Sequence, residues 1–377
     1  MERVLILLII VMFSSCKNEE RHLSTSNNKG DTLTIEYAKG FSIIQFKGYK
    51  TLTVSNPWPN SDKNFTYLLV EKGTDIPENI DYDLKVEIPI QKIVVTSTTH
   101  IPSLEILDEN ETLVGFPGLN YISSEKIRTR ISKNSVTELG ENEAINTEVL
   151  ISLQPDAVIG FAIDGNNKTF QTIQKSGIPV IYNGDWTEES PLGKAEWIKF
   201  FGALYNKDQQ AEAYFNTIKN SYTEAKELAK NATSSPSVLS GSMYKDQWYV
   251  PYGNSWQAQF IKDANATYIY EDTNGNGSIA LSFESVLDKS HNAEFWVAPG
   301  QFKTFEQLAE TSAHYSQFKA VQDKKVFTYS NTLGSSGGVI YYELAPTRPD
   351  LVLKDLISIF HPELLPEHKT TFFKPLQ

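Results

Sequence analysis

The chain has 377 residues, a formal net charge of −12 and a pI near 5.1. An acidic surface repels phosphate backbones, and no lysine and arginine cluster offsets it, so nucleic acid is excluded as a partner. A single cysteine rules out an intramolecular disulfide. Burial must then stabilise the protein without such a crosslink, which a chain of this length can achieve in two domains.

The N-terminus has the pattern of a secretory signal. Arg3 precedes the apolar run Val4–Phe13, which is too short to span a bilayer, and small residues follow it. We therefore expect a signal peptide over residues 1–15. The tetrapeptide that ends at Cys16 resembles a bacterial lipobox, with Phe13 in place of the usual leucine, and this predicts lipidation of Cys16. The alternative is a signal peptide with an incidental cysteine.

Residues 16–31 are polar and are expected to form a flexible tether after the lipidated cysteine. Within it, Lys17–Glu20 resembles the acidic surface-export signal of some lipoproteins. A β-rich segment follows over residues 32–91. Strands are predicted at Leu33–Tyr37 and Thr66–Val70 because polar and apolar residues alternate there. We expect this segment to pack on the lobe that follows it.

Beyond this segment, short apolar runs alternate with helical patterns, which predicts an N-terminal α/β lobe over residues 92–205 with a parallel sheet. The expected strands are Lys92–Thr96, Leu113–Gly115, Ala157–Gly160 and Pro179–Tyr182. The expected helices are Ser103–Asn110, Glu148–Leu153 and Lys168–Ser176.

A long amphipathic helix is predicted over Lys207–Lys230, with Asn206 as its N-cap. At 1.5 Å per residue it spans about 36 Å, roughly the width of a small domain. We assign residues 206–232 to this linking helix and residues 233–377 to a C-terminal α/β lobe. That lobe is expected to include the strands Trp248–Val250 and Val326–Tyr329 and the helix Pro349–Phe360.

One pattern occurs in both predicted lobes. A capping residue stands two positions before a glutamate, Asn146 before Glu148 and Ser282 before Glu284. A short helix, a polar turn and an apolar strand ending in glycine follow in each case. The repetition suggests two lobes of related construction, each with an exposed glutamate at a helix start. The alternative is chance similarity, since such αβ units are common.

Taken in order, these features resemble the class III substrate-binding proteins of ABC importers, which bind ferric siderophores, haem or cobalamin. The residues that carry the resemblance are Lys92–His100, Glu148–Val158, Ile178–Ile181, Ser282–Leu287 and Arg348–Leu356. The resemblance extends from Lys92 to Leu364. It implies an α/β fold of two Rossmann-like lobes joined by one long helix, with the β-rich N-terminal extension packed on the first lobe. It also implies a monomer without a cofactor of its own, which holds an iron chelate, haem or cobalamin between its lobes.

The resemblance further implies a partner and a location. Glu148 and Glu284 match the positions at which family members contact arginines of the importer permease. The alternative is that both only stabilise their own helices through the helix dipole. The expected location is the cell envelope, lipid-anchored to a membrane and facing the periplasm. A second hypothesis is a surface-displayed haem- or metallophore-binding lipoprotein that serves outer-membrane uptake.

An enzymatic function is not supported by the sequence. Gly334–Gly338 lacks the lysine of a phosphate-binding loop, and there is no Gly-x-Ser-x-Gly motif. The only cysteine is assigned to the lipid. The histidines include no close pair, so no dedicated metal site is predicted.

Candidates for ligand binding lie beside glycines and loops at expected strand ends, where open α/β sheets bind their ligands. His100 ends the loop after the first predicted strand, although a histidine bonded to loop backbone is the alternative. Arg348 is placed to pair with an anionic chelate. Aromatic side chains can stack on a large flat ligand, but each is alternatively a core residue. The aromatic candidates are Tyr121, Phe161, Trp186, Trp248, Tyr249, Tyr252 and Trp256.

Overall fold

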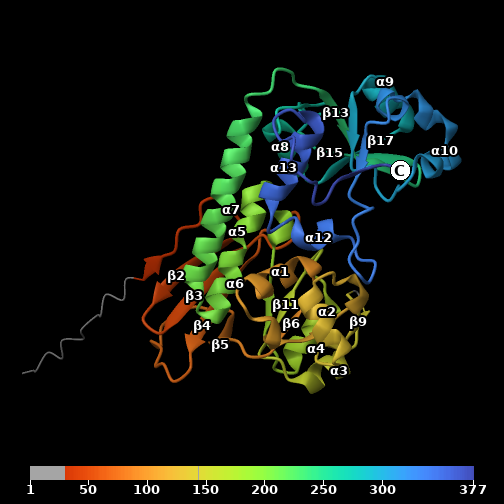
Figure 1. The fold of residues 1–377 in the computed structure, drawn as a ribbon. Coiled ribbons are helices and arrows are strands. Elements are labelled where there is room, and N and C mark those ends of the chain that lie inside the picture. Colours follow the sequence, from red (N-terminus) through yellow and green to blue (C-terminus); the bar gives the residue numbers. More distant parts are fainter. Residues whose placement is uncertain (1–29, 143) are drawn as a thin grey trace, which may run out of the picture.

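The computed structural model describes residues 30–142 and 144–377. The expected signal peptide, Cys16 and nearly all of the tether lie outside these residues. Two lobes lie one above the other in Figure 1, and helix α7 (Asp208–Ala229) runs along both of them. The predicted fold class is therefore confirmed: an α/β protein of two lobes joined by one long helix. No helix of the described residues is long and apolar enough to cross a membrane.

The N-terminal extension folds as a five-stranded sheet in the order β1-β2-β3-β4-β5. Its strands are β1 (Asp31–Thr32), β2 (Phe41–Phe46), β3 (Tyr49–Ser55), β4 (Asn64–Glu71) and β5 (Leu84–Ile88). The predicted strand Thr66–Val70 is confirmed within β4, which pairs antiparallel with β3 and parallel with β5. Apolar residues of the sheet, such as Phe41 and Leu52, share one buried cluster with Phe200 of α6 (Ile198–Tyr205). The extension is thus packed on the first lobe, as expected.

The predicted strand Leu33–Tyr37 is wrong. Only the N–H of Leu33 still bonds to β2, at the carbonyl of Ile43; the backbone then leaves the sheet, and two buried carboxylates of the first lobe bind the residues that follow. Glu196, at the end of α5 (Pro191–Glu196), accepts the backbone N–H groups of residues 36, 37 and 38 at 2.7–3.0 Å. Glu188 accepts those of residues 39 and 40 at 2.9–3.1 Å. Segment 33–40 is therefore fixed to the first lobe by side chains that are remote in sequence.

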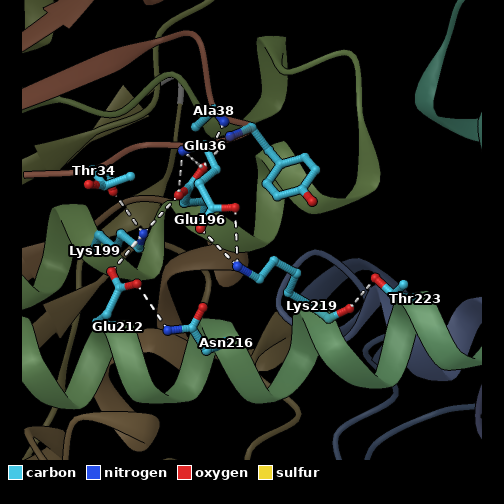
Figure 2. Close-up of polar contacts among 10 residues, drawn as sticks. Thr34, Glu36, Ala38, Glu196, Lys199, Glu212, Asn216, Lys219 and Thr223 are labelled. Atoms are coloured by element: carbon cyan, nitrogen blue, oxygen red, sulfur yellow. Dashed lines mark hydrogen bonds and ion pairs between the residues drawn. The ribbon is translucent and has the colours of Figure 1, made fainter.

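Figure 2 shows the charges around Glu196. Lys199 donates to the Glu196 carboxylate at 2.8 Å, to Glu212 of α7 at 2.7 Å and to the carbonyl of Thr34 at 2.9 Å. Lys219 of α7 pairs with Glu36 at 2.8 Å. The network joins three elements: segment 33–40, the α5–α6 region and the linking helix.

The first lobe has a parallel sheet in the order β12-β11-β6-β7-β8. Its strands are β6 (Ile93–Val95), β7 (Leu113–Phe116), β8 (Thr137–Glu138), β11 (Ala157–Gly160) and β12 (Val180–Tyr182). A two-stranded sheet, β9 (Gly140–Glu141) with β10 (Ala144–Ile145), lies beside it. Every residue of β6, β11 and β12 is buried, as expected for parallel strands covered by helices on both faces.

Helices cover this sheet and follow the predicted alternation. They are η1 (Thr98–His100), α1 (Ile101–Ile106), η2 (Asn110–Thr112), η3 (Leu119–Tyr121), α2 (Glu125–Ser132), α3 (Thr147–Leu153), α4 (Lys168–Lys175) and η4 (Asp185–Thr187), followed by α5 and α6. The predicted helix Ser103–Asn110 begins and ends earlier, as α1.

The linking helix is confirmed, but its predicted cap is wrong. Asn206 adopts a left-handed conformation (φ 54°) and ends α6, its N–H bonded to the carbonyl of Gly202. Lys207 occupies the N-cap of α7 without a side-chain hydrogen bond. Asparagine tolerates the left-handed conformation that closes a helix, so it serves here as a C-cap.

The second lobe has a sheet in the order β16-β13-β18-β19-β20, parallel except for β20. Its strands are β13 (Ser237–Ser240), β16 (Thr267–Tyr268), β18 (Phe295–Val297), β19 (Val326–Thr328) and β20 (Lys374–Pro375). A separate antiparallel sheet contains β14 (Ser242–Tyr244), β15 (Gln247–Pro251) and β17 (Ser278–Leu281). The helices are α8 (Trp256–Asp263), α9 (Phe283–Ser290), α10 (Phe305–Thr311), η5 (Ala313–Gln317), α11 (Lys319–Gln322), α12 (Ile340–Leu344) and α13 (Pro349–Phe360).

The two αβ units with the repeated pattern occupy equivalent places in their lobes. Helix α3 leads to β11, which pairs with β6, the first strand of its lobe. Helix α9 leads to β18, which pairs with β13, the first strand of the other lobe. The strand order is also the same over four strands, β7-β6-β11-β12 in the first lobe and β16-β13-β18-β19 in the second, so β7 and β16 occupy equivalent places. The lobes differ only in the fifth strand, since β8 lies parallel beside β7 and β20 lies antiparallel beside β19.

Candidate functional site

Three adjoining cavities make up what we call the interlobe cleft: two are lined by both lobes, and the third is lined by the second lobe alone. Their volumes are about 650, 750 and 210 Å³. The 750 and 210 Å³ cavities share Trp186 and Trp256, while Gln257 and Ser278 line both the 650 and the 750 Å³ cavities. Tyr342 lines both the 650 and the 210 Å³ cavities. Shared walls make this one continuous site, large enough for a ligand bigger than an amino acid or a simple sugar.

The second lobe contributes the carboxyl ends of its central strands. Ser240 ends β13, and the loop Ala298–Gly300 follows β18; both line the 650 Å³ cavity. Strand order reverses between β13 and β18, and open α/β sheets bind ligands at such a point. Ala298 has a left-handed backbone (φ 56°), which is uncommon for a residue with a Cβ and typical of functional loops.

The first lobe contributes Thr99, after β6, and Asp185 and Trp186, after β12, to the 210 Å³ cavity. Lys194 of α5 also lines this cavity, and its Nζ donates to the carbonyls of residues 185 and 186 at 3.1 Å. The same Nζ lies 5.3 Å from the ring centroid of Trp256 in the second lobe. This cation–π contact crosses the cleft and joins the two lobes.

Burial sets the charge state of this lysine. Loss of solvent lowers the pKa of Lys194 to about 8, while the carboxylates of Asp185 and Glu188 oppose that change. Both carboxylates are themselves buried. The cation is thus already matched by nearby negative charge inside the protein.

Some predicted ligand residues do meet in the cleft. Trp186 and Trp256 line it from opposite lobes, and Tyr249 lines it from β15. Phe161 packs against Trp186 with 5.3 Å between the ring centroids. Tyr252 covers Gly275, whose backbone lines the 750 Å³ cavity; a Cβ on that glycine would meet the Tyr252 ring at 2.5 Å. Their contact with a ligand stays a prediction.

The positions of two other candidates correct the sequence-based expectation. Trp248 is fully buried in the core of the second lobe, 5.1 Å from Trp296 between ring centroids. Successive residues of a strand point to opposite faces, so β15 turns Tyr249 outward and Trp248 inward. His100 is also fully buried, and it packs against Phe201 at 5.6 Å. Neither of these side chains lines the cleft.

His100 also departs from the alternative weighed for it, a hydrogen bond to loop backbone. Neither ring nitrogen has a hydrogen-bond partner among the described residues. Burial lowers the pKa of His100, although Asp185 and Asn183 nearby favour the charged form. The imidazole is therefore held neutral behind the cleft wall.

Tyr121 and Arg348 lie outside the cleft as well. The Tyr121 side chain is 70% exposed at the end of η3. The Arg348 guanidinium forms two hydrogen bonds with the Asp350 carboxylate, at 2.9 and 3.0 Å. That carboxylate raises the pKa of Arg348 and holds its charge away from the cleft.

Glu148 and Glu284 are both exposed, each in the first turn of its helix. Asn146 and Ser282 cap these helices by accepting the N–H of Val149 and Ser285. Hydrogen bonds from its own backbone N–H and from Ser282 lower the pKa of Glu284, so it stays ionised. Helices α3 and α9 lie at opposite outer ends of the molecule in Figure 1.

The sequence analysis missed several residues of the cleft. Trp58, in the loop between β3 and β4, lines the 750 Å³ cavity, and Tyr342 lines the other two. Lys194 gave no signal, because α5 was not predicted. Trp58 belongs to the run Asn56–Pro59, whose asparagine and two prolines are typical of a loop, but nothing in this pattern indicates that it reaches the cleft. Among residues 30–142 and 144–377, no group of three or more His, Cys, Asp or Glu side chains is placed to hold a metal ion.

Residues 93–333 match the model of the family described as periplasmic binding protein. Among curated proteins, an uncharacterised lipoprotein of Methanocaldococcus jannaschii is 27% identical to this chain. That alignment covers 98% of this chain and 94% of the relative, so the β-rich extension is included in it.

Solved structures share the fold at low sequence identity. A possible iron-binding (periplasmic solute-binding) protein of Staphylococcus epidermidis is 16% identical with a TM-score of 0.58, covering 72% of this chain and 99% of that one. A periplasmic heme-binding protein of Pseudomonas aeruginosa is 17% identical with a TM-score of 0.55, covering 76% and 96%. The periplasmic vitamin B12-binding protein BtuF of Vibrio cholerae is 11% identical with a TM-score of 0.50, covering 74% and 99%.

Proposed function

We propose a function from one premise: this chain belongs to the periplasmic binding protein family. The solved structures that share its fold are those of substrate-binding proteins. The chain is accordingly a binding protein and not an enzyme. In our proposal it captures a metal complex, either an iron chelate such as a ferric siderophore or haem, or cobalamin. It holds the complex between its lobes and delivers it to the permease of an ABC importer.

The observation that supports ligand capture best is the interlobe cleft itself. It lies at the carboxyl ends of the central strands, and indoles from both lobes, Trp186 and Trp256, line its centre. Indole faces offer large apolar area for a macrocycle or a chelate, and the loops around them offer hydrogen-bond partners.

Delivery to the permease is supported by the two exposed glutamates. Glu148 and Glu284 occupy the same position of equivalent αβ units, one in each lobe. Capped helix starts hold both carboxylates in fixed directions, and the helix dipole favours their negative charge. Two such points, one per lobe, fit a partner built of two similar subunits.

Membrane attachment belongs to the same proposal. The family is periplasmic, and the Methanocaldococcus jannaschii relative is named a lipoprotein. We propose that a lipid on Cys16 anchors the protein to a membrane of the cell envelope. Mass spectrometry of the protein from its host tests this: the mature N-terminus should begin at a diacylglyceryl-modified Cys16, and an unmodified cysteine there would contradict the proposal.

Ligand capture is tested with protein purified from its host. Native mass spectrometry and an absorbance spectrum should reveal a bound complex, and a haem or corrin band would identify its class. The unloaded protein is then titrated separately with haem, vitamin B12 and a ferric trihydroxamate. Tryptophan fluorescence monitors each titration and gives the affinity. Failure to bind any metal complex would contradict the proposal.

Delivery is tested with the double variant Glu148→Ala/Glu284→Ala in a reconstituted importer. Ligand affinity should be unchanged, while uptake should fall through slower, salt-sensitive association of the two partners. A matched control is Glu125→Ala, an exposed glutamate in the first turn of α2. Uptake by the double variant equal to that of the control would refute the docking role.

A further inference from the structure

The N-terminal extension reaches the cleft as well as the first lobe. Its loop between β3 and β4, residues 56–63, contributes Asn56, Trp58, Pro59, Asn60 and Ser61 to the wall of the 750 Å³ cavity. Facing residues of the second lobe are Asn254–Gln257 and Gly275–Ser278. The cavity thus lies between the extension and first lobe on one side and the second lobe on the other.

This loop is held rigidly against the first lobe. The N–H of Asn56 donates to the carbonyl of Lys63 at 2.9 Å, which closes the loop. The Trp58 ring packs edge-on against Tyr182 of β12 at 5.4 Å. Gly165 and Gly184 allow this close approach: a Cβ on either would lie 3.1 Å from Trp58 or from Pro57. Packed in this way, the loop is a fixed wall of the cavity.

The groups on this wall and opposite it are mostly uncharged. Amides and hydroxyls predominate, from residues such as Asn60, Ser61, Asn254 and Asn276, beside the three indoles. The charged side chains among the described residues that line the cleft are Lys39, Asp185, Glu188, Glu189 and Lys194.

Each cation of this set already has an acidic neighbour. Lys39 pairs with Glu189 at 3.4 Å, and Lys194 lies close to Asp185 and Glu188. Glu188 in turn accepts the backbone N–H groups of residues 39 and 40 and the Nε1–H of Trp197 at 3.0 Å. An anionic ligand would therefore find no unmatched positive charge in the cleft.

We infer that the loop 56–63 of the extension is part of the ligand-binding site, and that the ligand presents an uncharged face of amide or hydroxyl groups to it. The inference rests on the proposed function and narrows its ligand class. Vitamin B12, with a rim of amides, and an uncharged ferric trihydroxamate fit this chemistry. Haem, which carries two carboxylates, does not.

Loop variants of the mature chain test the first part. Asn60 has a left-handed backbone (φ 59°), so Asn60→Gly removes its amide without straining the loop. Loss of one neutral hydrogen bond should weaken binding of the best probe about 2- to 10-fold. Ser61→Trp fills the cavity and should weaken it more than about 10-fold. Asn134→Gly is the matched control, since Asn134 is also exposed and left-handed (φ 55°) but lies outside the cleft.

The charge of the ligand is tested with the same probes. Vitamin B12 or the ferric trihydroxamate should bind more tightly than haem. Raising the salt concentration from about 0.02 to about 0.5 M should leave the affinity for this uncharged probe nearly unchanged. Tightest binding of haem, or a steep loss of affinity with salt, would overturn the ligand class. Wild-type affinity of both loop variants would overturn the role of the extension alone. If no probe binds the unaltered chain, the proposed function falls and this inference with it.

Discussion

Replacement of Glu196 by alanine is the most informative test of how the extension is held. The Glu196 carboxylate is completely buried, and it accepts three backbone N–H groups and the ammonium of Lys199 (Figure 2). Without this carboxylate three N–H groups lose their acceptor, and Lys199 keeps only the partly exposed Glu212 as a charge partner; breaking a buried ion pair costs about 3–5 kcal/mol. We therefore expect Glu196→Ala to lower the free energy of unfolding of the first lobe and extension by about 3–5 kcal/mol.

Glutamine should not rescue this position. The groups around Glu196 are all donors, and the side-chain amide of glutamine would add two donors of its own to them. Glu196→Gln should thus lose nearly as much stability as Glu196→Ala. Glu212→Ala is the control, because Glu212 contacts the same Lys199 but is 44% exposed; its loss should cost about 1 kcal/mol or less.

Urea unfolding followed by tryptophan fluorescence measures the stability change. Hydrogen exchange of the backbone amides of residues 36–38 measures its location, since these amides donate to the Glu196 carboxylate. They should exchange much faster in Glu196→Ala and at the original rate in Glu212→Ala. Stability within about 1 kcal/mol of the original, or unchanged exchange at these amides, would refute the role assigned to this carboxylate.

Three further predictions concern the lobes and the cleft. The Glu343 carboxylate of α12 accepts the N–H groups of Ser123 and Ser124 across the lobe boundary, and burial raises its pKa from 4.5 to about 7. The folded protein then holds a proton that the unfolded chain releases, so this contribution to stability is complete below about pH 4.5 and is lost as the pH rises through about 7. The melting temperature of the wild type should therefore fall across that pH range, and that of Glu343→Gln should fall less. The same pH dependence in both proteins would contradict this role of Glu343. Trp186→Ala should weaken ligand binding with little change in the melting temperature of the unloaded protein. If the free energy of unfolding of the unloaded protein instead falls by several kcal/mol, Trp186 is a core residue. Because α7 is continuous over 22 residues and has no loop hinge, ligand binding should tilt the lobes only slightly in small-angle scattering, and a rotation of tens of degrees would exclude this rigid link.

Local patterns in the sequence determined the elements and their order. Buried strands such as Ala157–Gly160, the terminal helix Pro349–Phe360 and the capped starts at Asn146 and Ser282 were all predicted and are confirmed. Each depends on residues within a few positions of one another, through side-chain periodicity or a cap that bonds three residues ahead. The fold class followed from the order of these elements.

Only the tertiary structure decided which side chains reach the cleft. Trp248 and Tyr249 are neighbours with similar sequence surroundings, yet the pairing of β15 in a separate sheet buries one and exposes the other. Leu33–Tyr37 looks like a strand, but the backbone of segment 33–40 is bound by carboxylates about 150 residues later in the chain. The loop around Trp58 becomes a cleft wall because it packs on β12. Contacts of this range depend on how sheets and helices pack in space, and local periodicity does not encode that packing.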